Sequence, residues 1–444
     1  MLVPRTRLIL WTSVIVLPLA AIGATVPGAT GLSLFCIGSF LAAVIFDAMA
    51  ASGRLHGIAV LLPEVVRLQK DRPGGFELRL QNDTKAARTL RIGIAFPREI
   101  VTATDDRITT LPADVALSRI EWEVTPAERG LFVLDRVYVE AASPLGFWSR
   151  RASQPLRCEL RVYPNLFKEH RHVAAVFLKR SLLGVRAQRQ VGQGREFEKL
   201  REYVPGDSIE EIHWKASAKR GHPVTKVFQV ERTQEVYVVI DASRLSARKL
   251  PTDTGEATAL ERFVTAGLIL GAAAEQQGDQ FGLLTFSDRV LSFVRAKSGQ
   301  AHYEACRDRL YTLQPQSVSP DFEELCAFIR LRLRKRALLI FLTALDDPLL
   351  AESFAKSAEL ICRQHLVLVN MLQQPGVAPL FSDSKAADVD DVYRRLAGHL
   401  QWRDLRELEN ILRRRGIRFS LLDSDRLAGQ LVAQHAEVKG RQLL

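Results

Sequence analysis

The stretch that decides the fold is VYVVIDAS, residues 236–243. Its first five residues, Val236–Ile240, form an apolar run of the kind found in strands that are buried on both faces of a sheet. Asp241 and Ser243 follow directly, and α/β sheets bind metals or ligands beyond the carboxyl ends of their strands. The stretch therefore predicts a parallel sheet, and it marks the edge of that sheet where a site is expected.

A charged and aromatic segment leads into this strand. Residues 194–207 read GREFEKLREYVPGD, and residues 212–215 read IHWK. A histidine next to Glu210 and Glu211 suggests acid–base chemistry, but no nucleophile accompanies it. We expect Trp214 to pack on the α/β domain and the charged residues to pair with one another, so that the segment forms a docking surface for a partner protein. Its predicted partner-binding residues are Arg201, Glu202, Asp207, His213, Trp214 and Lys215.

Downstream of Gln234, short apolar runs alternate with helical stretches to the end of the chain. Strands are expected at 236–240, 281–286, 290–294, 337–342, 366–372 and 417–422. Helices are expected at 258–277, 303–313, 321–334, 348–363, 392–415 and 424–437. This alternation predicts a doubly wound α/β domain over residues 234–444. No glycine-rich nucleotide loop and no Gly-x-Ser-x-Gly elbow follows any of the strands.

The N-terminal region is apolar and uncharged from Leu8 to Phe46. It is too long for one membrane span and long enough for two, with a turn at Pro27-Gly28. We predict a helical hairpin within residues 1–54, with spans at about 8–26 and 30–50. A secretory signal is the alternative, and the second apolar run argues against it. Arginines at both ends favour a hairpin whose two ends are cytoplasmic.

Residues 55–165 carry short β-rich runs separated by turn residues, without helical stretches between them. The turns are expected at Arg72–Gly75, Gln81–Asp83 and Ser143–Gly146. Strands at this spacing predict a β-sandwich-like domain. The segment contains no catalytic constellation, so we interpret it as a structural or protein-binding module.

Composition narrows the classes of partner. The chain has 444 residues and a formal net charge of +11, which favours anionic lipids, nucleic acid or an acidic protein. The basic clusters at 330–336 and 413–415 end predicted helices, where cations are favoured. Because no nucleic-acid motif accompanies them, we predict no nucleic-acid partner. Five widely spaced cysteines without a Cys-x-x-Cys pair suit a reducing compartment.

The segment 192–219 resembles the signature of the "domain of unknown function fifty-eight" family. The matching runs are GQGREF at 192–197, LREY at 200–203, GD at 206–207 and IHWKASAK at 212–219. The resemblance implies a bacterial inner-membrane protein with a membrane hairpin, a β-sandwich-like domain, the signature segment at 166–233 and a von Willebrand factor A-like α/β domain. It also implies two partners, a MoxR-type AAA+ ATPase and a transglutaminase-like membrane protein.

Von Willebrand factor A-like domains hold a divalent cation in an Asp-x-Ser-x-Ser loop, with a Thr and an Asp from two further loops. Here Asp241 and Ser243 match, Leu245 replaces the second serine, and Ser319 is a candidate for the Thr position. Ala344 stands where the Asp is expected. The resemblance therefore implies a degenerate Mg²⁺ site, and we expect Asp241 and Ser243 to cap the backbone instead.

These observations favour a non-enzymatic, membrane-anchored scaffold or adaptor with cytoplasmic soluble domains. The alternative is a metal-dependent hydrolase that uses the Asp241/Ser243 loop. An adhesion-type receptor facing outwards is a third possibility, and membrane topology distinguishes it from the other two.

Overall fold

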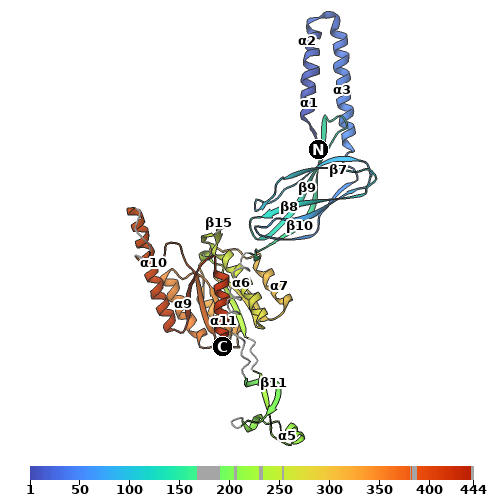
Figure 1. The fold of residues 1–444 in the computed structure, drawn as a ribbon. Coiled ribbons are helices and arrows are strands. Elements are labelled where there is room, and N and C mark those ends of the chain that lie inside the picture. Colours follow the sequence, from blue (N-terminus) through green and yellow to red (C-terminus); the bar gives the residue numbers. More distant parts are fainter. Residues whose placement is uncertain are drawn as a thin grey trace. The chain divides into compact units, whose positions relative to one another are not determined.

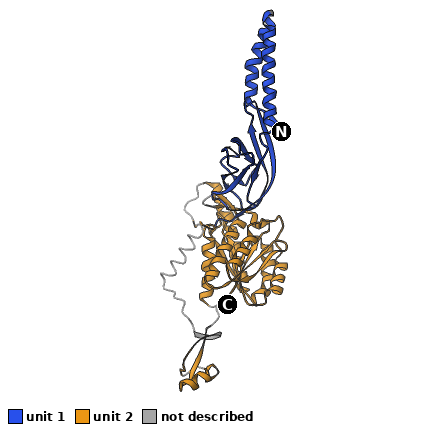
Figure 2. Cartoon of the chain, turned by 90° about the vertical axis from the view of Figure 1, so that its right-hand side faces the viewer, with its two compact units in different colours: residues 1–165 blue, residues 166–444 orange. Residues whose placement is uncertain are grey.

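The computed structural model describes residues 1–167, 191–204, 208–229, 234–252, 255–380, 382 and 388–441. The chain divides into two compact units, residues 1–165 and 166–444 (Figures 1 and 2). The first unit has one buried apolar cluster and the second has two.

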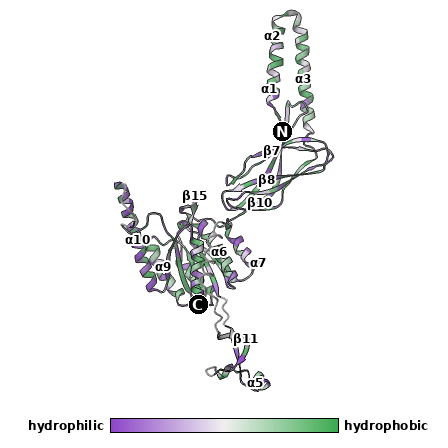
Figure 3. Ribbon diagram, in the orientation of Figure 1, coloured by the Kyte–Doolittle hydropathy of each residue, from purple (hydrophilic) through white to green (hydrophobic). Residues whose placement is uncertain are grey.

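The first unit begins with two long helical segments. Helix α1 (Thr6–Trp11) continues through a π-helical turn at Thr12–Val16 into α2 (Leu17–Thr25). A 3-10 turn at Pro27–Ala29 then leads into α3 (Thr30–Ser52). The two segments have 20 and 23 residues and a mean hydropathy of 2.1, so both are long and apolar enough to cross a membrane (Figure 3). Their ends lie close to those of the predicted spans.

The rest of the first unit consists of strands in two main sheets. One sheet has the order β1-β10-β9-β5-β7, with β3 also paired to β10, and the other has the order β2-β4-β8-β6. The strands are β1 (Leu2–Pro4), β2 (Ile58–Leu61), β3 (Val65–Gln69), β4 (Gly74–Asn82), β5 (Arg88–Ile94), β6 (Ile100–Val101), β7 (Asp106–Leu111), β8 (Leu117–Pro126), β9 (Gly130–Ala142) and β10 (Trp148–Tyr163). Buried side chains from both sheets form one apolar cluster.

The turn expected at Arg72–Gly75 is shorter than predicted, because Gly74 and Gly75 already belong to β4. A Cβ on Gly74 would lie 2.9 Å from Cδ2 of Leu68. A larger residue here would displace the end of the Leu68 side chain, so the close approach favours glycine, and the prediction took it for a turn signal instead.

The larger sheet of the second unit has the order β17-β16-β13-β18-β19-β20. Its strands are β13 (Glu235–Asp241), β16 (Gln280–Phe286), β17 (Val290–Lys297), β18 (Leu338–Leu342), β19 (Leu366–Leu372) and β20 (Arg418–Leu422). All neighbours pair in parallel except β17, which is antiparallel to β16. All six fall at or within two residues of the predicted strands, apart from the C-terminal extension of β17.

Helices cover both faces of this sheet (Figure 1). They are α6 (Ala259–Gln276), α7 (Gln300–Leu310), α8 (Phe322–Arg332), α9 (Pro348–Cys362), α10 (Val389–Arg414) and α11 (Leu427–Gly440). In β13 the side chains of Val236, Val238 and Ile240 pack with α6, α7 and α11, whereas Tyr237 and Val239 pack with α8, α9 and α10. Successive side chains of a strand point to opposite faces of the sheet, which explains this division. Because both faces are covered by helices, all of these side chains are apolar.

The signature segment forms a small element of its own. Strands β11 (Val191–Glu202) and β12 (Val224–Gln229) pair as an antiparallel ribbon. A 3-10 turn at Ile209–Glu211 and helix α5 (Trp214–Arg220) lie in the connection between them. Two short strands, β14 (Lys249–Thr252) and β15 (Gly255–Thr258), complete the second unit.

Candidate functional site

The carboxyl end of β13 places Asp241 at the expected edge of the sheet. The side chain is fully buried. Its Oδ1 accepts a hydrogen bond from the backbone N–H of Ser243 at 2.8 Å, and its Oδ2 accepts one from Oγ1 of Thr343 at 2.6 Å. Burial raises the pKa of the Asp241 carboxyl, and the bonds from Thr343 and Ser243 offset this only in part. Both carboxylate oxygens are therefore engaged by the protein itself.

The loop after Asp241 turns its two serines toward the backbone. Residues Arg244–Ala247 form a 3-10 turn in which Oγ of Ser243 accepts a bond from the N–H of Leu245 at 3.3 Å. The hydroxyl of Ser246 donates to the carbonyl of Ser243 at 2.8 Å. These contacts agree with the predicted capping role of Ser243.

Arginine side chains stand against the other two loops. The backbone N–H of Arg244 donates to the carbonyl of Val318, and its guanidinium Nε donates to Oγ of Ser319 at 3.1 Å. In the third loop, a guanidinium nitrogen of Arg248 lies 2.6 Å from Oδ2 of Asp346. Burial raises the pKa of the Asp346 carboxyl, but the bond and charge of Arg248, together with bonds from the Asp346 backbone and Gln374, outweigh burial and hold that pKa below its ordinary value.

An arginine stands beside two of the oxygens that a divalent cation would use. A cation bound to Ser319 would face the guanidinium of Arg244, and like charges about 4 Å apart repel by about 4 kcal/mol for each unit of charge at a partly exposed site. Asp346 is already neutralised by Arg248. In the part of the chain that the structure describes, no group of three His, Cys, Asp or Glu side chains is placed to hold a metal ion.

Replacing Asp241 by asparagine should leave the free energy of unfolding at pH 7 unchanged or raise it by up to about 1 kcal/mol. The ionised carboxylate is disfavoured by burial, so its cost appears as pH rises above the ordinary Asp pKa of about 3.9, whereas the amide of an asparagine is neutral throughout. Asp241→Ala should cost about 1–3 kcal/mol, because the Thr343 hydroxyl and the Ser243 N–H lose their acceptor. Urea unfolding measures both. An asparagine variant less stable than the alanine variant would contradict this view.

The signature residues take roles that the sequence did not suggest. His213 is the N-cap of α5, and its Nδ1 accepts a bond from the N–H of Ala216 at 3.1 Å. Trp214 was expected to pack on the α/β domain, but its side chain is 66% exposed. That part of the prediction is wrong, because Trp214 is the first residue of a short helix that has no buried residue.

The expected pairing of charges in the signature segment is found only in part. A guanidinium nitrogen of Arg201 lies 3.4 Å from the carbonyl of Glu202, whose carboxylate lies 3.6 Å from Nε2 of His222. Lys215 is exposed. Asp207 lies outside the described residues. The partner-binding role of these residues stays a prediction.

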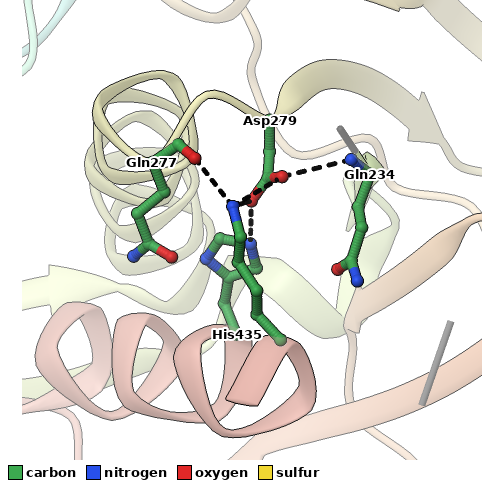
Figure 4. Close-up of polar contacts among 5 residues, drawn as sticks. Gln234, Gln277, Asp279 and His435 are labelled. Carbon is green, nitrogen blue, oxygen red and sulfur yellow. Dashed lines mark hydrogen bonds and ion pairs between the residues drawn. The ribbon is translucent and has the colours of Figure 1, made fainter. Parts of the chain in front are cut away.

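A buried polar cluster at the opposite end of the sheet was missed by sequence reasoning (Figure 4). Asp279 and His435 are fully buried, with 3.0 Å between Oδ2 and Nε2. Nζ of Lys439 lies 2.8 Å from both oxygens of Asp279 and donates to the carbonyl of Gln277. The N–H of Gln234 donates to Oδ1 at 3.1 Å. The only sequence signal was the i, i+4 spacing of His435 and Lys439, which places both on one face of α11.

A second missed feature lies in the first unit. Asp47 belongs to α3 and is fully buried. Its carboxylate accepts bonds from Oγ of Ser143 at 2.6 Å and from the N–H groups of Leu145 and Phe147 at 2.9 and 3.1 Å. The indole of Trp148 donates to the carbonyl of Val44 at 3.1 Å. The apolar hairpin is therefore joined to the β-strands by a polar junction. Asp47 was visible in the sequence only as the end of the uncharged run.

Comparison with known proteins supports the resemblance drawn from the signature. Residues 199–379 match the family described as "Protein of unknown function DUF58", which confirms the resemblance over that region. The uncharacterized proteins Rv1480 of Mycobacterium tuberculosis (strain ATCC 25618 / H37Rv) and Mb1516 of Mycobacterium bovis (strain ATCC BAA-935 / AF2122/97) are each 23% identical over 205 residues. The matched region is 45% of this chain and spans 60% of the length of those relatives.

Solved structures show distant similarity. The conserved hypothetical protein BatB from Bacteroides thetaiotaomicron is 15% identical, with a TM-score of 0.28, over 46% of this chain and 99% of its own. An aerotolerance-related membrane protein from Bacteroides fragilis NCTC 9343 is 14% identical, also with a TM-score of 0.28, over 46% of this chain and 98% of its own. These likenesses are too weak to carry an argument, so the assignment of the α/β domain rests on its strand order and helix placement.

Proposed function

We propose that this chain, which matches the DUF58 family over residues 199–379, is a membrane-anchored scaffold or adaptor that binds a partner protein and catalyses no reaction. One observation carries the proposal. At the carboxyl edge of the sheet, arginines stand against the oxygens that a catalytic cation would need, and the Asp241 carboxylate is buried and fully hydrogen-bonded. The polar groups at this edge therefore bond to one another and to the backbone of the β13 loop.

The family resemblance supports a MoxR-type AAA+ ATPase as the partner and a transglutaminase-like membrane protein as a further component. Two sheets around one core support the β-sandwich-like description of the first unit, and helices on both faces support the doubly wound description of the α/β domain. The basic residues Arg5, Arg7 and Arg54 flank the apolar hairpin, which supports a bacterial inner-membrane location with cytoplasmic soluble domains.

Calorimetric titration of the detergent-solubilised chain with Mg²⁺ and Mn²⁺ separates the scaffold from a metal-dependent hydrolase. We expect no binding in the micromolar range, because the guanidinium groups of Arg244 and Arg248 lie beside Ser319 and Asp346 and would repel a cation there. Micromolar binding that Asp241→Ala abolishes would favour the hydrolase. The variant Ser424→Ala is a matched control, since it removes a hydroxyl outside this loop.

Orientation is tested by a reporter fused after Leu444. A reporter that is active only inside the cytoplasm is expected from the positive charges flanking the hairpin. Activity only outside the cytoplasm would overturn the orientation and favour a receptor facing outwards.

A further inference from the structure

Helix α10 carries an apolar stripe that nothing in the described part of the chain covers. Its members are exposed by 42% to 69% and repeat at helical spacing along one face. They are Val389, Val392, Tyr393, Leu396 and Leu400. Single exposed apolar residues are ordinary, but a contiguous row on one helix face marks an interaction surface.

The stripe is exposed although α10 packs firmly on the rest of the α/β domain. On the opposite side, a Cβ on Gly398 would lie 2.0 Å from the carbonyl oxygen of Gly376, so the helix packs directly on that loop. Nδ1 of His399 accepts a bond from the N–H of Leu380 at 3.0 Å. Further along, Leu405 and Leu412 are buried in the core. The helix is fixed by its inner face, and the stripe is its free outer face.

The stripe leads into a groove between α9 and α10. The groove has a volume of about 560 Å³. Its apolar floor includes Ala351, Ala355, Leu405, Leu408 and Ile411. From Val389 to Ile411 the surface runs for about 33 Å along the helix axis, at 1.5 Å per residue.

Acidic side chains line the groove on a chain whose net charge is positive. Glu352 comes from α9, and Asp404 and Glu407 come from α10; the lining also includes the basic residue Arg415, directly after α10. Asp404 lies 3.3 Å from its neighbour Arg403. Among the described residues, Glu352 and Glu407 have no ion-pair partner. Their negative charge is therefore available to a ligand, next to the apolar floor.

We propose that this surface, the stripe and the groove together, binds a basic amphipathic helix of a partner protein. The apolar face of that helix would lie along Tyr393, Leu396 and Leu400, and its lysine or arginine side chains would reach Glu352 and Glu407. An apolar stripe that receives an amphipathic helix is a recurring mode of recognition. A bilayer surface is disfavoured, because anionic lipids would meet these carboxylates. The inference adds a docking surface on α9 and α10, whose groove reaches Asp346 at one end, and it does not depend on the scaffold proposal.

The probe is an 18-residue synthetic helix with leucine along one face and lysine on its flanks, and its partner is the full-length chain in detergent. We expect saturable binding that weakens at least tenfold when Leu396 and Leu400 are both replaced by glutamine, because two buried leucine contacts are lost. Glu407→Lys should weaken binding several-fold and reduce its dependence on salt. All three residues are exposed, so folding should be unaffected.

Matched controls lie on α8. Leu331→Gln changes a leucine that is 77% exposed, and Glu323→Lys reverses an exposed charge, so both should bind the probe like the unchanged chain. A probe with glutamate in place of lysine should bind at least tenfold more weakly. Equal binding of the two probes, or equal loss with the α8 variants, would overturn the proposal. Two further results would overturn it. One is that vesicles with 30% anionic phospholipid capture the chain only when Leu396 and Leu400 are present. The other is a dimer, seen by sedimentation, that the substitution of both leucines abolishes.

Discussion

Replacing Asp279 by alanine should destabilise the α/β domain by about 3–5 kcal/mol. The change would remove the carboxylate that pairs with the ring of His435 and with the ammonium group of Lys439, which would keep only the carbonyl of Gln277. It would also remove the acceptor of the Gln234 N–H. Pulse proteolysis of the full-length chain over a urea series measures the effect, read on the band of the α/β domain.

The control for this prediction is a double variant that removes the negative and the positive charge of the cluster together. Asp279→Asn combined with Lys439→Met removes both charges, so it should recover part of the lost stability relative to Asp279→Ala. Glu437→Ala, on the same helix, breaks only a surface pair with Arg441 and should cost less than about 1 kcal/mol. A cost below about 1 kcal/mol for Asp279→Ala would show that the cluster is not a stabilising element.

The same cluster predicts the response to acid. Burial raises the pKa of the Asp279 carboxyl, but the bonds from His435, Lys439 and the Gln234 N–H, together with the charge of Lys439, outweigh burial and hold that pKa below its usual value. A depressed pKa gives stability that is present above the ordinary Asp pKa of about 3.9 and is lost as pH falls through the lower folded value. Asp279→Asn should therefore flatten the loss of stability below about pH 4.

The position of this cluster matters for the proposed scaffold. Gln234 is where the chain enters β13 from the signature segment, and Lys439 and His435 belong to the last helix. The cluster therefore ties α11 to the first residue of the α/β domain. A partner bound to the signature segment would therefore apply force at Gln234, which the ion pair of Asp279 and Lys439 holds to α11.

The elements of the α/β domain could be predicted because each is a local pattern. Val236–Ile240 and Leu338–Leu342 are apolar without interruption, and this is the pattern of strands covered on both faces. Helix α10 follows a capping residue, Asp388, whose carboxylate accepts from the N–H of Asp391. Such signals lie within a few residues of one another, so a single sequence contains them.

The contacts that define the sites could not be predicted in the same way. The bond from Arg244 to Ser319 joins residues 75 apart, and the bond from Asp279 to His435 joins residues 156 apart. The loop motif shows that Asp241 and Ser243 are present. It does not show which side chains lie where the motif's second serine and its Asp are replaced by Leu245 and Ala344. His213 was predicted to bind a partner, and nothing in the sequence around it indicates that its ring nitrogen caps α5.

The polar junction at Asp47 gives the second large prediction. Asp47→Ala should expose the loop 143–148 to solvent and speed hydrogen exchange at the Leu145 and Phe147 amides by at least about 100-fold. The reason is that two backbone donors and the Ser143 hydroxyl lose a buried charged acceptor together. Exchange measured by mass spectrometry on a peptide covering this loop reports the change in the solubilised full-length chain.

Two variants separate the junction from a general loss of stability. Ser143→Ala removes one donor and should give a smaller increase in exchange, whereas Asp135→Ala, on the exposed face of β9, should give none. The double change of Asp47 and Ser143 should cost less than the sum of the two single changes, since both act on one bond. Unchanged protection of the loop in Asp47→Ala would mean that the hairpin is held to the strands by Trp148 and the pairing of β1 with β10 alone. The expected result means instead that the buried carboxylate fixes the loop against the last turns of α3, so that the apolar hairpin and the β-strands are joined through Asp47.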